Sequence, residues 1–572
     1  MIKTLAGQVK EFKKDSIITP IFMILEVIME MIIPLLMSSI IDDGVEKGDI
    51  HHIYIIGIWM VVAAGIGLFA GIMGGKYGAR ASTGFARNLR QAMFENIQTF
   101  SFSNIDKFST PSLVTRMTTD VTNLQNSYQM LLRMCVRAPF SLICAMIMSF
   151  SVNVKLSSIY LVAVIILGAL LAIIIWRAMG YFTAMFKKYD DLNESVQENV
   201  SAIRVVKAYV KEDYETERFN KANDELVGIQ LDVLLLLSYM TPVMNIILNL
   251  SVVAVIKVGG IQVMDGSATP GNVMAAITYC SQGLNAVMRM TMIFQTASRG
   301  VASQKRIMEV LNCEPAIKDG AYDGETIVKG KVEFRNVSFA YPGNEGASVI
   351  EDFNLVISPG ETIGILGATG CGKTSLISLI PRFYDVTKGA VLVDDVDVRD
   401  YKLEVLRDKI AVSLQKSEIF TASIADNIAW GLPDATPDNI AAAADTAQAA
   451  QFINNRKDGM QTIVSQGGHS LSGGQRQRVA IARAVIKPAE ILIFDDATSA
   501  LDLKTEAELY SKLGKNKKDI TKIIIAQRIA SVKNADRIVV MDNGKLADVG
   551  SHEQLMITSS IYKDIYDSQL KK

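Results

Sequence analysis

The chain has 572 residues with a formal net charge of −1 at pH 7, and only 20% of its residues are charged. This length allows several domains, and the positive mean hydropathy argues against a wholly soluble protein. The balanced charge and the lack of a basic stripe with interleaved aromatic residues argue against a nucleic-acid partner.

Apolar residues are concentrated in the first half of the chain, where they predict six membrane-spanning helices. The expected spans are residues 17–41, 53–73, 138–152, 159–176, 233–258 and 273–294. Arginine and lysine gather between spans two and three and between spans four and five, whereas the other loops are short and poor in positive charge. By the positive-inside rule, the N-terminus and the C-terminal half are expected in the cytoplasm, on a multi-pass protein of the cell (cytoplasmic) membrane.

The two basic stretches are too long for simple loops, and they stay amphipathic and compatible with helix. We therefore expect helices two to five to continue well beyond the membrane, with turns near residues 107–111 and 210–213. The membrane domain is expected over residues 1–311 and a polar, glycine-containing linker over residues 312–330. A soluble α/β domain is expected over residues 331–572.

Two carboxylates lie within the first expected span. Glu26 and Glu30 are four residues apart, so both project from one helical face. Ionisable side chains at membrane depth are costly and usually face a cavity or a partner. One interpretation is a substrate pathway that attracts cations; the other is a structural pairing with Arg133 and Arg137, which are also four residues apart. The sequence leaves both interpretations open.

The soluble half contains a phosphate-binding pattern. Residues 367–374 fit G-x-x-x-x-G-K-[ST], between a strand-like run at 362–366 and a helix-like run at 375–380. Glycines let the backbone curl so that its N–H groups point at phosphate oxygens. Lys373 is expected to reach the β- and γ-phosphates, and the Thr374 hydroxyl to bind Mg²⁺. The pattern predicts a multidomain protein, in which an all-α polytopic membrane domain precedes an α/β P-loop ATPase domain. The expected ATP-binding residues here are Gly367, Ala368, Thr369, Gly370, Cys371, Gly372, Lys373, Thr374 and Ser375.

Downstream motifs identify the family that this chain resembles. A five-residue signature follows the P-loop, and after it a buried-strand pattern at 491–494 ends in Asp495 and Asp496. The chain resembles the ATP-binding cassette (ABC) family over essentially its whole length, and its membrane half is similar to the six-helix domain of ABC exporters. The signature residues are Leu471, Ser472, Gly473, Gly474 and Gln475.

The resemblance implies a role for each matching residue. Tyr341 would stack on the adenine ring, Asp495 would hold Mg²⁺, and Gln415 would touch Mg²⁺ and couple to the membrane domain. The signature would contact ATP bound to the opposite subunit, so one cassette per chain implies a dimer. ATP and Mg²⁺ are the implied cofactors. The positions that match the D-loop of the family are Ser499 and Asp502.

Two positions depart from the family pattern. Asp496 stands where active cassettes have the glutamate that polarises the attacking water, and Gln527 stands where they have a histidine. Aspartate is one methylene shorter, which moves its oxygens by roughly 1–1.5 Å, and misplacements of about 1 Å are costly. Glutamine donates a hydrogen bond but cannot become cationic. Gln415, Asp496 and Gln527 are therefore expected to belong to a slowly hydrolysing site.

These observations predict one subunit of a heterodimeric exporter, whose signature completes a competent site on a second ABC half-transporter. The expected activity is ATP-driven export of hydrophobic or amphipathic small molecules of the multidrug type. Membrane lipid and a hydrophobic or cationic substrate are the other expected partners. Three alternatives stay open: lipid or peptide export, a mainly regulatory subunit that binds ATP and gates a catalytic partner, and a homodimer with weak ATPase activity.

Overall fold

The computed structural model describes residues 2–324, 327–343 and 348–570, apart from the side chains of residues 2, 3, 291, 292, 294–299 and 570. Internal contacts divide the chain into two compact units. The first, called here the helical unit, comprises Met1–Gln98 and Pro111–Cys313. The second, called here the cassette, comprises Thr99–Thr110 and Glu314–Lys572.

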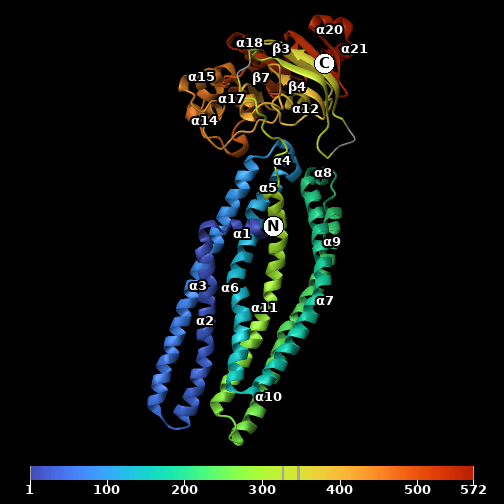
Figure 1. Cartoon of the computed structure of the whole chain (residues 1–572). Coiled ribbons are helices and arrows are strands. Elements are labelled where there is room, and N and C mark those ends of the chain that lie inside the picture. The colour runs from blue at the N-terminus through green and yellow to red at the C-terminus, as the bar shows by residue number, and fades with distance from the viewer. Residues whose placement is uncertain (1, 325–326, 344–347, 571–572) are drawn as a thin grey trace. The chain divides into compact units, whose positions relative to one another are not determined.

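Long helices make up the helical unit (Figure 1). α3 has 49 residues and α7 has 48, so each is about 70 Å long at a rise of 1.5 Å per residue. A bilayer core is only about 30 Å thick, which confirms the expectation that these helices continue beyond it. The helices and helical turns are α1 (Ile2–Gly7), η1 (Lys10–Phe12), α2 (Lys13–Ser39), η2 (Ile40–Val45), α3 (Ile50–Gln98), α5 (Thr110–Thr115), η3 (Arg116–Asp120), α6 (Val121–Val152), α7 (Val154–Ser201), α8 (Ile203–Ala208), α9 (Glu212–Ser238), α10 (Met240–Met264) and α11 (Pro270–Leu311).

Within the described residues, five helical stretches are long and apolar enough to cross a membrane. The protein is therefore a multi-pass membrane protein. The sixth expected span, residues 273–294, lies on α11 and includes positions whose side chains are outside the described residues. The five stretches are Lys10–Val45, Ile50–Gln98, Thr110–Val152, Val154–Ser201 and Glu212–Met264.

The expected turns and spans agree with the helices except at one place. Ser109 and Val210 adopt positive φ angles of 56° and 51° within the two expected turns. The fifth expected span, residues 233–258, is interrupted at Tyr239, where α9 ends and α10 begins. The cause is Pro242, which has no N–H to donate to a carbonyl of the preceding turn and therefore starts a new helix.

Two sheets form the centre of the cassette. Among the described residues, one sheet has the order β2-β1-β4-β5 and the other has the order β10-β9-β3-β8-β7-β6. In the second sheet β9, β3, β8, β7 and β6 are parallel, and β7 and β8 are buried along their whole length, as expected for a parallel sheet covered on both faces. The strands are β1 (Val332–Phe339), β2 (Ile350–Ile357), β3 (Thr362–Gly367), β4 (Lys388–Val393), β5 (Val396–Asp397), β6 (Ile410–Ser413), β7 (Ile491–Asp495), β8 (Thr521–Ile525), β9 (Arg537–Asp542) and β10 (Lys545–Gly550).

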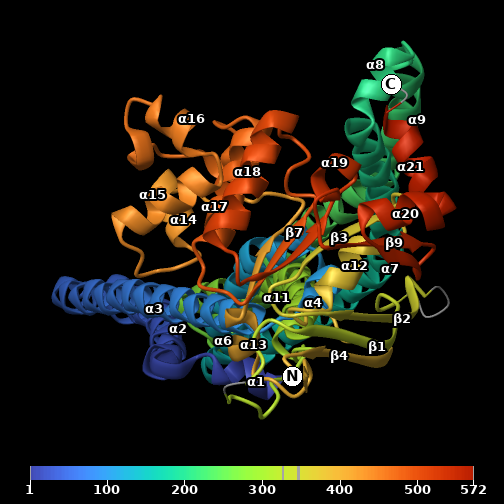
Figure 2. The same ribbon diagram turned by 90° about the horizontal axis from the view of Figure 1, so that it is seen from above.

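Helices surround these sheets. Seen from above, α14, α15, α16 and α17 form a group beside the strands (Figure 2), and α17 packs on both α14 and α15. The helices of the cassette are α4 (Phe102–Phe108), α12 (Lys373–Ser378), α13 (Leu403–Asp408), α14 (Ile424–Ala429), α15 (Pro437–Thr446), α16 (Ala450–Asn454), α17 (Gly473–Val485), α18 (Leu503–Asn516), α19 (Ile529–Val532), α20 (His552–Thr558) and α21 (Ser560–Leu570).

Two segments expected outside the soluble domain pack with the cassette. α4 stacks Phe102 on Phe383, with ring centroids 4.4 Å apart, and Asp106 accepts a 2.7 Å hydrogen bond from the Tyr384 hydroxyl. The expected linker lies against the same unit, since the Tyr322 N–H donates to the Asp400 carbonyl at 2.7 Å. The boundaries expected at residues 311 and 330 stay predictions.

Candidate nucleotide-binding site

The site lies at one edge of the parallel sheet. The P-loop follows β3, Gln415 follows β6, Asp495 ends β7, and Gln527 comes two residues after β8. The carboxyl ends of parallel strands lie at the same edge of a sheet, which is where α/β proteins bind their ligands. The parallel register therefore brings together residues that lie up to 160 positions apart in the chain.

Glycines are required in the P-loop. Gly367, Gly370 and Gly372 have φ angles of 156°, 86° and 98°, which L side chains rarely adopt. A Cβ atom at Gly367 would lie 2.3 Å from the Met541 carbonyl oxygen, and one at Gly372 would lie 2.9 Å from the Val349 carbonyl oxygen. The loop therefore keeps an open backbone cradle of the kind that accommodates phosphate.

The Lys373 ammonium lies at this loop, together with two oxygen groups that could bind a metal ion, the Thr374 hydroxyl and the Asp495 carboxylate. The Lys373 ammonium donates to the carbonyls of Gly367 and Ala368 at 2.9 and 2.8 Å. The Thr374 hydroxyl donates to a carboxylate oxygen of Asp495 at 3.0 Å. Hydroxyl and carboxylate oxygens are the ligands that Mg²⁺ prefers, so these residues fit a magnesium ion beside a bound phosphate.

The two consecutive aspartates are both buried, with 2% of Asp495 and 8% of Asp496 exposed. Burial raises the pKa of Asp495, and the neighbouring Asp496 charge adds to the increase, while the Thr374 hydrogen bond and the Lys373 charge oppose it. Burial also raises the pKa of Asp496, against hydrogen bonds from Gln527 and Gln415 and the charge of Lys373. Gln415 thus lies close to Asp496, as its place after β6 requires.

Asp496 is held by the residue that replaces the family's histidine. The Gln527 side-chain amide donates to an Asp496 carboxylate oxygen at 2.9 Å. Asp496 itself has a φ of 47°, and its N–H donates to the Ile525 carbonyl at 3.0 Å. The two departures from the family pattern are therefore direct partners, and each restricts the side chain of the other.

Tyr341 lies beside the P-loop. Its hydroxyl is 2.9 Å from the Ser375 hydroxyl, and its ring meets those of Phe339 and Tyr384 edge to face at 4.9 and 5.2 Å. The half-buried ring is thus held by the two aromatic neighbours and by the hydrogen bond of its hydroxyl group. Its stacking on adenine stays a prediction.

The signature forms the start of α17. Ser472 caps the helix by accepting from the Gln475 N–H at 3.3 Å, and the Gln475 side chain accepts from the Ser472 N–H at 3.1 Å. Such a reciprocal pair satisfies donors that a helix start leaves free. In the described part of the chain, no hydrogen bond or ion pair joins residues 471–475 to residues 367–375.

Gln477 joins the signature helix to the D-loop, a link that the sequence analysis missed. Its amide donates to the Ser499 hydroxyl at 2.9 Å, and its carbonyl oxygen accepts from the Ala500 N–H at 2.9 Å. Asp502 caps α18 by accepting from the Thr505 N–H at 2.9 Å. Gln477 stands only two residues after the signature, so its position was a signal that could have found it.

Arg528 and Glu506 extend this link to Gln527. The Arg528 guanidinium donates to the carbonyls of Leu501 and Ser499 at 3.1 and 3.3 Å. It also lies 3.7 Å from the buried Glu506 carboxylate, which accepts hydroxyl hydrogen bonds from Thr498 and Ser531. Signature helix, D-loop and the segment after β8 are therefore one hydrogen-bonded assembly.

The carboxylates of the first span lie in the helical unit. Arg137 pairs with both, its two terminal nitrogens lying 3.2 Å from Glu26 and 3.2 Å from Glu30. The two carboxylates and both arginines also line one cavity between α2, α3 and α6. Each of the two interpretations of the sequence thus has a counterpart in the structure, with Arg137 alone as the ion-pair partner among the described residues.

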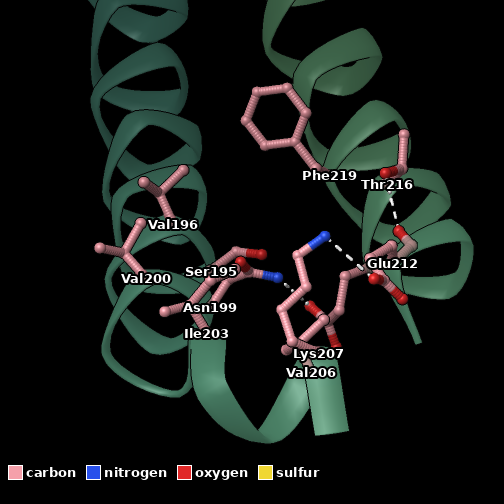
Figure 3. Close-up of a pocket in the computed structure, with 11 residues that line it drawn as sticks. Ser195, Val196, Asn199, Val200, Ile203, Val206, Lys207, Glu212, Thr216 and Phe219 are labelled. Atoms are coloured by element: carbon pink, nitrogen blue, oxygen red, sulfur yellow. Dashed lines mark hydrogen bonds and ion pairs between the residues drawn. The ribbon is translucent and has the colours of Figure 1, made fainter. Parts of the chain in front are cut away.

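A second hollow lies between the ends of α7 and α9, next to α8 (Figure 3). Lys207 bonds to Glu212 at 2.9 Å, and Asn199 bonds to Glu215 at 3.0 Å. These bonds close the end of the hairpin, and the remaining walls are mostly apolar side chains such as Val196 and Phe219, together with Ser195 and Thr216.

Comparisons with known proteins agree with this architecture. Residues 16–287 match the family described as ABC transporter transmembrane region, and residues 350–499 match the family described as ABC transporter. The uncharacterized ABC transporter ATP-binding protein YfiB of Bacillus subtilis is 36% identical, over 96% of this chain and 95% of that protein. An ATP-dependent lipid A-core flippase of Syntrophus aciditrophicus is 33% identical, over 90% of this chain and 84% of that protein.

A solved structure of a bacterial Atm1-family ABC exporter with ATP bound has the same fold. Its TM-score is 0.80 at 24% sequence identity, and the match covers 97% of this chain and 98% of that chain.

Proposed function

We propose, from the premise that this chain belongs to the ABC transporter family, that it is one half of a two-chain exporter with unequal ATP sites. Its ATPase domain and its membrane helices make it an ATP hydrolase coupled to transport. ATP and Mg²⁺ are its cofactors.

The residues at the sheet edge would hold the nucleotide. The P-loop N–H groups and Lys373 would bind its phosphates, Tyr341 would stack on its base, and Thr374 and Asp495 would bind Mg²⁺ with help from Gln415. Mg²⁺ supplies charge neutralisation at the phosphates when it is bound. The signature would face a second nucleotide, and among the described residues no hydrogen bond or ion pair joins residues 471–475 directly to the P-loop of this chain.

The single observation that carries the asymmetric proposal is the hydrogen bond between Gln527 and Asp496. A carboxylate that is one methylene shorter than glutamate is directed toward an amide that cannot take up a proton. A water that attacks the γ-phosphate would find neither a well-placed base nor a titratable partner, and the lack of such help costs roughly 10²–10⁴-fold in rate. The partner chain would supply the glutamate and the histidine of the competent site.

The exposed turn that joins α7 to α9 is a further argument that a second chain is part of the transporter. α4 packs on the cassette of its own chain through Phe102 and Asp106. α8 and its turn instead expose Val205, Tyr209 and Val210 at 57%, 73% and 80%. Apolar side chains grouped in this way mark a protein contact, and a cassette of the partner chain is the occupant that two-fold assembly offers.

We assign hydrophobic or amphipathic small molecules as the transported class, across the cell membrane and with the cassette in the cytoplasm. The basic stretches of the intracellular helices support this orientation. Lipid export is a second candidate, which the relatives named as lipid A-core flippases favour.

The proposal is tested by purifying the chain alone and together with a second ABC half-transporter, which is to be sought in the neighbouring open reading frame. ATP turnover and transport into sealed vesicles should be slow for the chain alone and fast for the pair. Transport by the chain alone that the second chain does not accelerate, even with slow turnover, would establish the homodimer. A pair in which this chain binds ATP without any effect of its signature on turnover would make it a regulatory subunit.

A further inference from the structure

The cavity between α2, α3 and α6 combines charge with apolar walls. Its volume is about 520 Å³, and its charged lining consists of Glu26, Glu30, Arg133 and Arg137. The rest of the lining is methionine, isoleucine, leucine, alanine and glycine, and the outermost of these, Leu68 and Ile72, are 67% and 56% exposed. Charged side chains at this depth in a membrane are costly and mark functional sites.

Glycines of α3 make room for these charges. A Cβ atom at Gly71 would lie 3.3 Å from the Glu26 carboxylate, and one at Gly78 would lie 3.2 Å from Arg133 Cδ. Small residues at a helix interface let backbones approach closely. Here they also leave space for two long polar side chains, so the positions of the charges are set by the packing of α2 and α6 on α3.

The charges are only partly paired. Arg137 takes one oxygen of each carboxylate, Oε1 of Glu26 and Oε2 of Glu30, both at 3.2 Å. The second oxygen of each has no hydrogen-bond donor among the described residues. Arg133 has no hydrogen bond or ion pair to any described residue either, and its Nε atom is buried without a partner. The cavity therefore presents free acceptor oxygens and a free guanidinium together.

The net charge decides which ligand fits. Two carboxylates and two guanidinium groups sum to zero, so an anionic or a cationic ligand would leave an uncompensated charge at membrane depth, which is strongly unfavourable. A ligand that carries both charges keeps the cavity neutral and supplies partners to both free groups. Its apolar part would lie along the wall that ends at Leu68 and Ile72.

We propose that this cavity binds the zwitterionic headgroup of an amphiphile, with the anionic group at Arg133 and the cationic group at Glu26 and Glu30. The proposal rests on the proposed function, since the bound amphiphile would be the molecule that the exporter carries. It differs from the expectation of a cationic substrate, because Arg137 already neutralises half of the negative charge.

The test compares three lipids with identical oleoyl chains: zwitterionic phosphatidylethanolamine, anionic phosphatidylglycerol and cationic ethyl-phosphatidylcholine. Binding to the purified two-chain complex in maltoside detergent is measured by native mass spectrometry. The unmodified protein should prefer the zwitterionic lipid by about tenfold or more, equivalent to about 1.4 kcal/mol. Arg133→Gln should shift the preference to the cationic lipid, and Glu30→Gln should shift it to the anionic lipid.

Two controls keep this outcome interpretable. Lys257→Gln removes an exposed cation of α10 and should leave the preference unchanged. Arg133→Lys keeps the charge and should keep the zwitterionic preference, which guards against reading a folding defect as lost recognition. If the unmodified protein binds the three lipids alike, or if Arg133→Gln and Glu30→Gln change all affinities equally, the proposal is overturned.

A separate measurement distinguishes a transported molecule from a resident lipid. ATP-driven transfer of a labelled phosphatidylethanolamine between leaflets of a vesicle would identify the amphiphile as substrate. Binding with the predicted charge preference but without such transfer would identify a resident lipid, and the site would stand while the transport assignment failed. ATP turnover by the pair tests the proposed function independently of either result.

Discussion

Asp496 and Gln527, the two departures from the family pattern, are bonded to each other in this site. The bond between them uses one carboxylate oxygen, and the left-handed backbone at Asp496 fixes the direction in which the short side chain leaves the strand. Burial raises the pKa of Asp496, against the hydrogen bonds from Gln527 and Gln415 and the charges of Lys373 and Arg528.

The first prediction separates this site from the competent one. Asp496→Ala should change the turnover of the assembled transporter by less than about tenfold, whereas glutamine in place of the partner's catalytic glutamate should lower it by roughly 10²–10⁴-fold. Steady-state ATP hydrolysis by both mutant pairs gives the comparison. Equal losses from the two changes would rule out the asymmetric assignment.

The second prediction concerns the signature. A carboxylate in residues 471–475 would meet the phosphate of the second ATP with like charge in a closed interface. Gly474→Asp should therefore abolish most hydrolysis, but a Cβ atom there would lie only 2.9 Å from the Ala500 carbonyl oxygen of the same chain. Gly473→Asp is the sharper variant, because its nearest neighbour is an ordinary 3.7 Å contact.

The control for this prediction is Gly514→Asp, at an exposed position of α18 where a Cβ atom meets nothing within 4 Å. ATP hydrolysis should fall in Gly473→Asp and stay near normal in Gly514→Asp, with similar melting temperatures for both. Normal hydrolysis in Gly473→Asp would reverse the assignment of the two sites.

At the scale of elements, side-chain hydrogen bonds join α17, the D-loop and the segment after β8. Gln477 bonds to Ser499 and Ala500, and Arg528 bonds to the carbonyls of Ser499 and Leu501. A displacement of the signature helix would therefore be carried to Gln527 and Asp496. In the proposed two-chain transporter, this arrangement would connect the second ATP site with the first through bonded groups.

The third prediction tests that connection. Gln477→Leu removes both bonds and leaves the Ala500 N–H without its partner, a loss of about 1–3 kcal/mol. Turnover by the pair should fall while ATP binding to this chain's P-loop stays unchanged. Gln477→Glu keeps an acceptor for the Ala500 N–H and should recover part of the turnover. Parallel loss of binding and turnover would indicate a general folding defect instead.

The fourth prediction concerns how β3 is tied to β9. Arg537 donates to both oxygens of Glu361 at 2.5 and 2.9 Å. Burial raises the pKa of Glu361, but the hydrogen bonds from Arg537 and Ser358 outweigh it and leave the pKa below its ordinary value. A lowered pKa means that the paired carboxylate stabilises the fold above the pKa of the unfolded chain, and that this stability is lost as the pH falls through the folded pKa.

Glu361→Gln should accordingly lower the melting temperature at pH 7, by a loss of about 1–3 kcal/mol, and the deficit should shrink below pH 5. Glu351→Gln is the matched control, because its pair with Lys545 at 3.3 Å is exposed on both sides and such pairs contribute about 0–1 kcal/mol. A pH-independent deficit in Glu361→Gln would indicate lost packing rather than a lost ion pair.

At the scale of the whole molecule, long helices extend the membrane segments far beyond the lipid. The end of α7 and the start of α9 form a hairpin whose apolar turn is exposed. The polar contacts of this turn, such as Lys207 with Glu212, stay within the hairpin. The hairpin therefore has a formed structure before any partner covers it, which lowers the ordering cost of docking.

The fifth prediction tests this surface. Val205→Ser combined with Tyr209→Ser should leave the melting temperature of the chain unchanged, because both side chains are mostly exposed. Substrate stimulation of ATP turnover by the pair should fall by about tenfold or more, since burying each apolar side chain contributes about 1.5–3 kcal/mol. Ile557→Ser, at an 87% exposed position of α20, should have no effect. Full stimulation in the double variant would exclude docking through α8.

The sequence by itself determined the local features of this protein. Apolar run length predicted membrane helices, and glycine spacing predicted the P-loop between β3 and α12, because lipid thickness and backbone φ angles act on neighbouring residues. The family resemblance supplied the two departures at Asp496 and Gln527. Even the break at Tyr239 was readable in principle, since Pro242 stands three residues later.

Only the tertiary structure decided which distant residues meet. The bond of Gln527 to Asp496 and the link from Gln477 to Ser499 depend on strand order and helix packing, which local periodicity does not encode. The same is true of the choice of Arg137 over Arg133 as partner of Glu26 and Glu30. Both arginines share one helical face, so a rotation of α6 against α2 and α3 selects between them, and that rotation is set by packing across three helices.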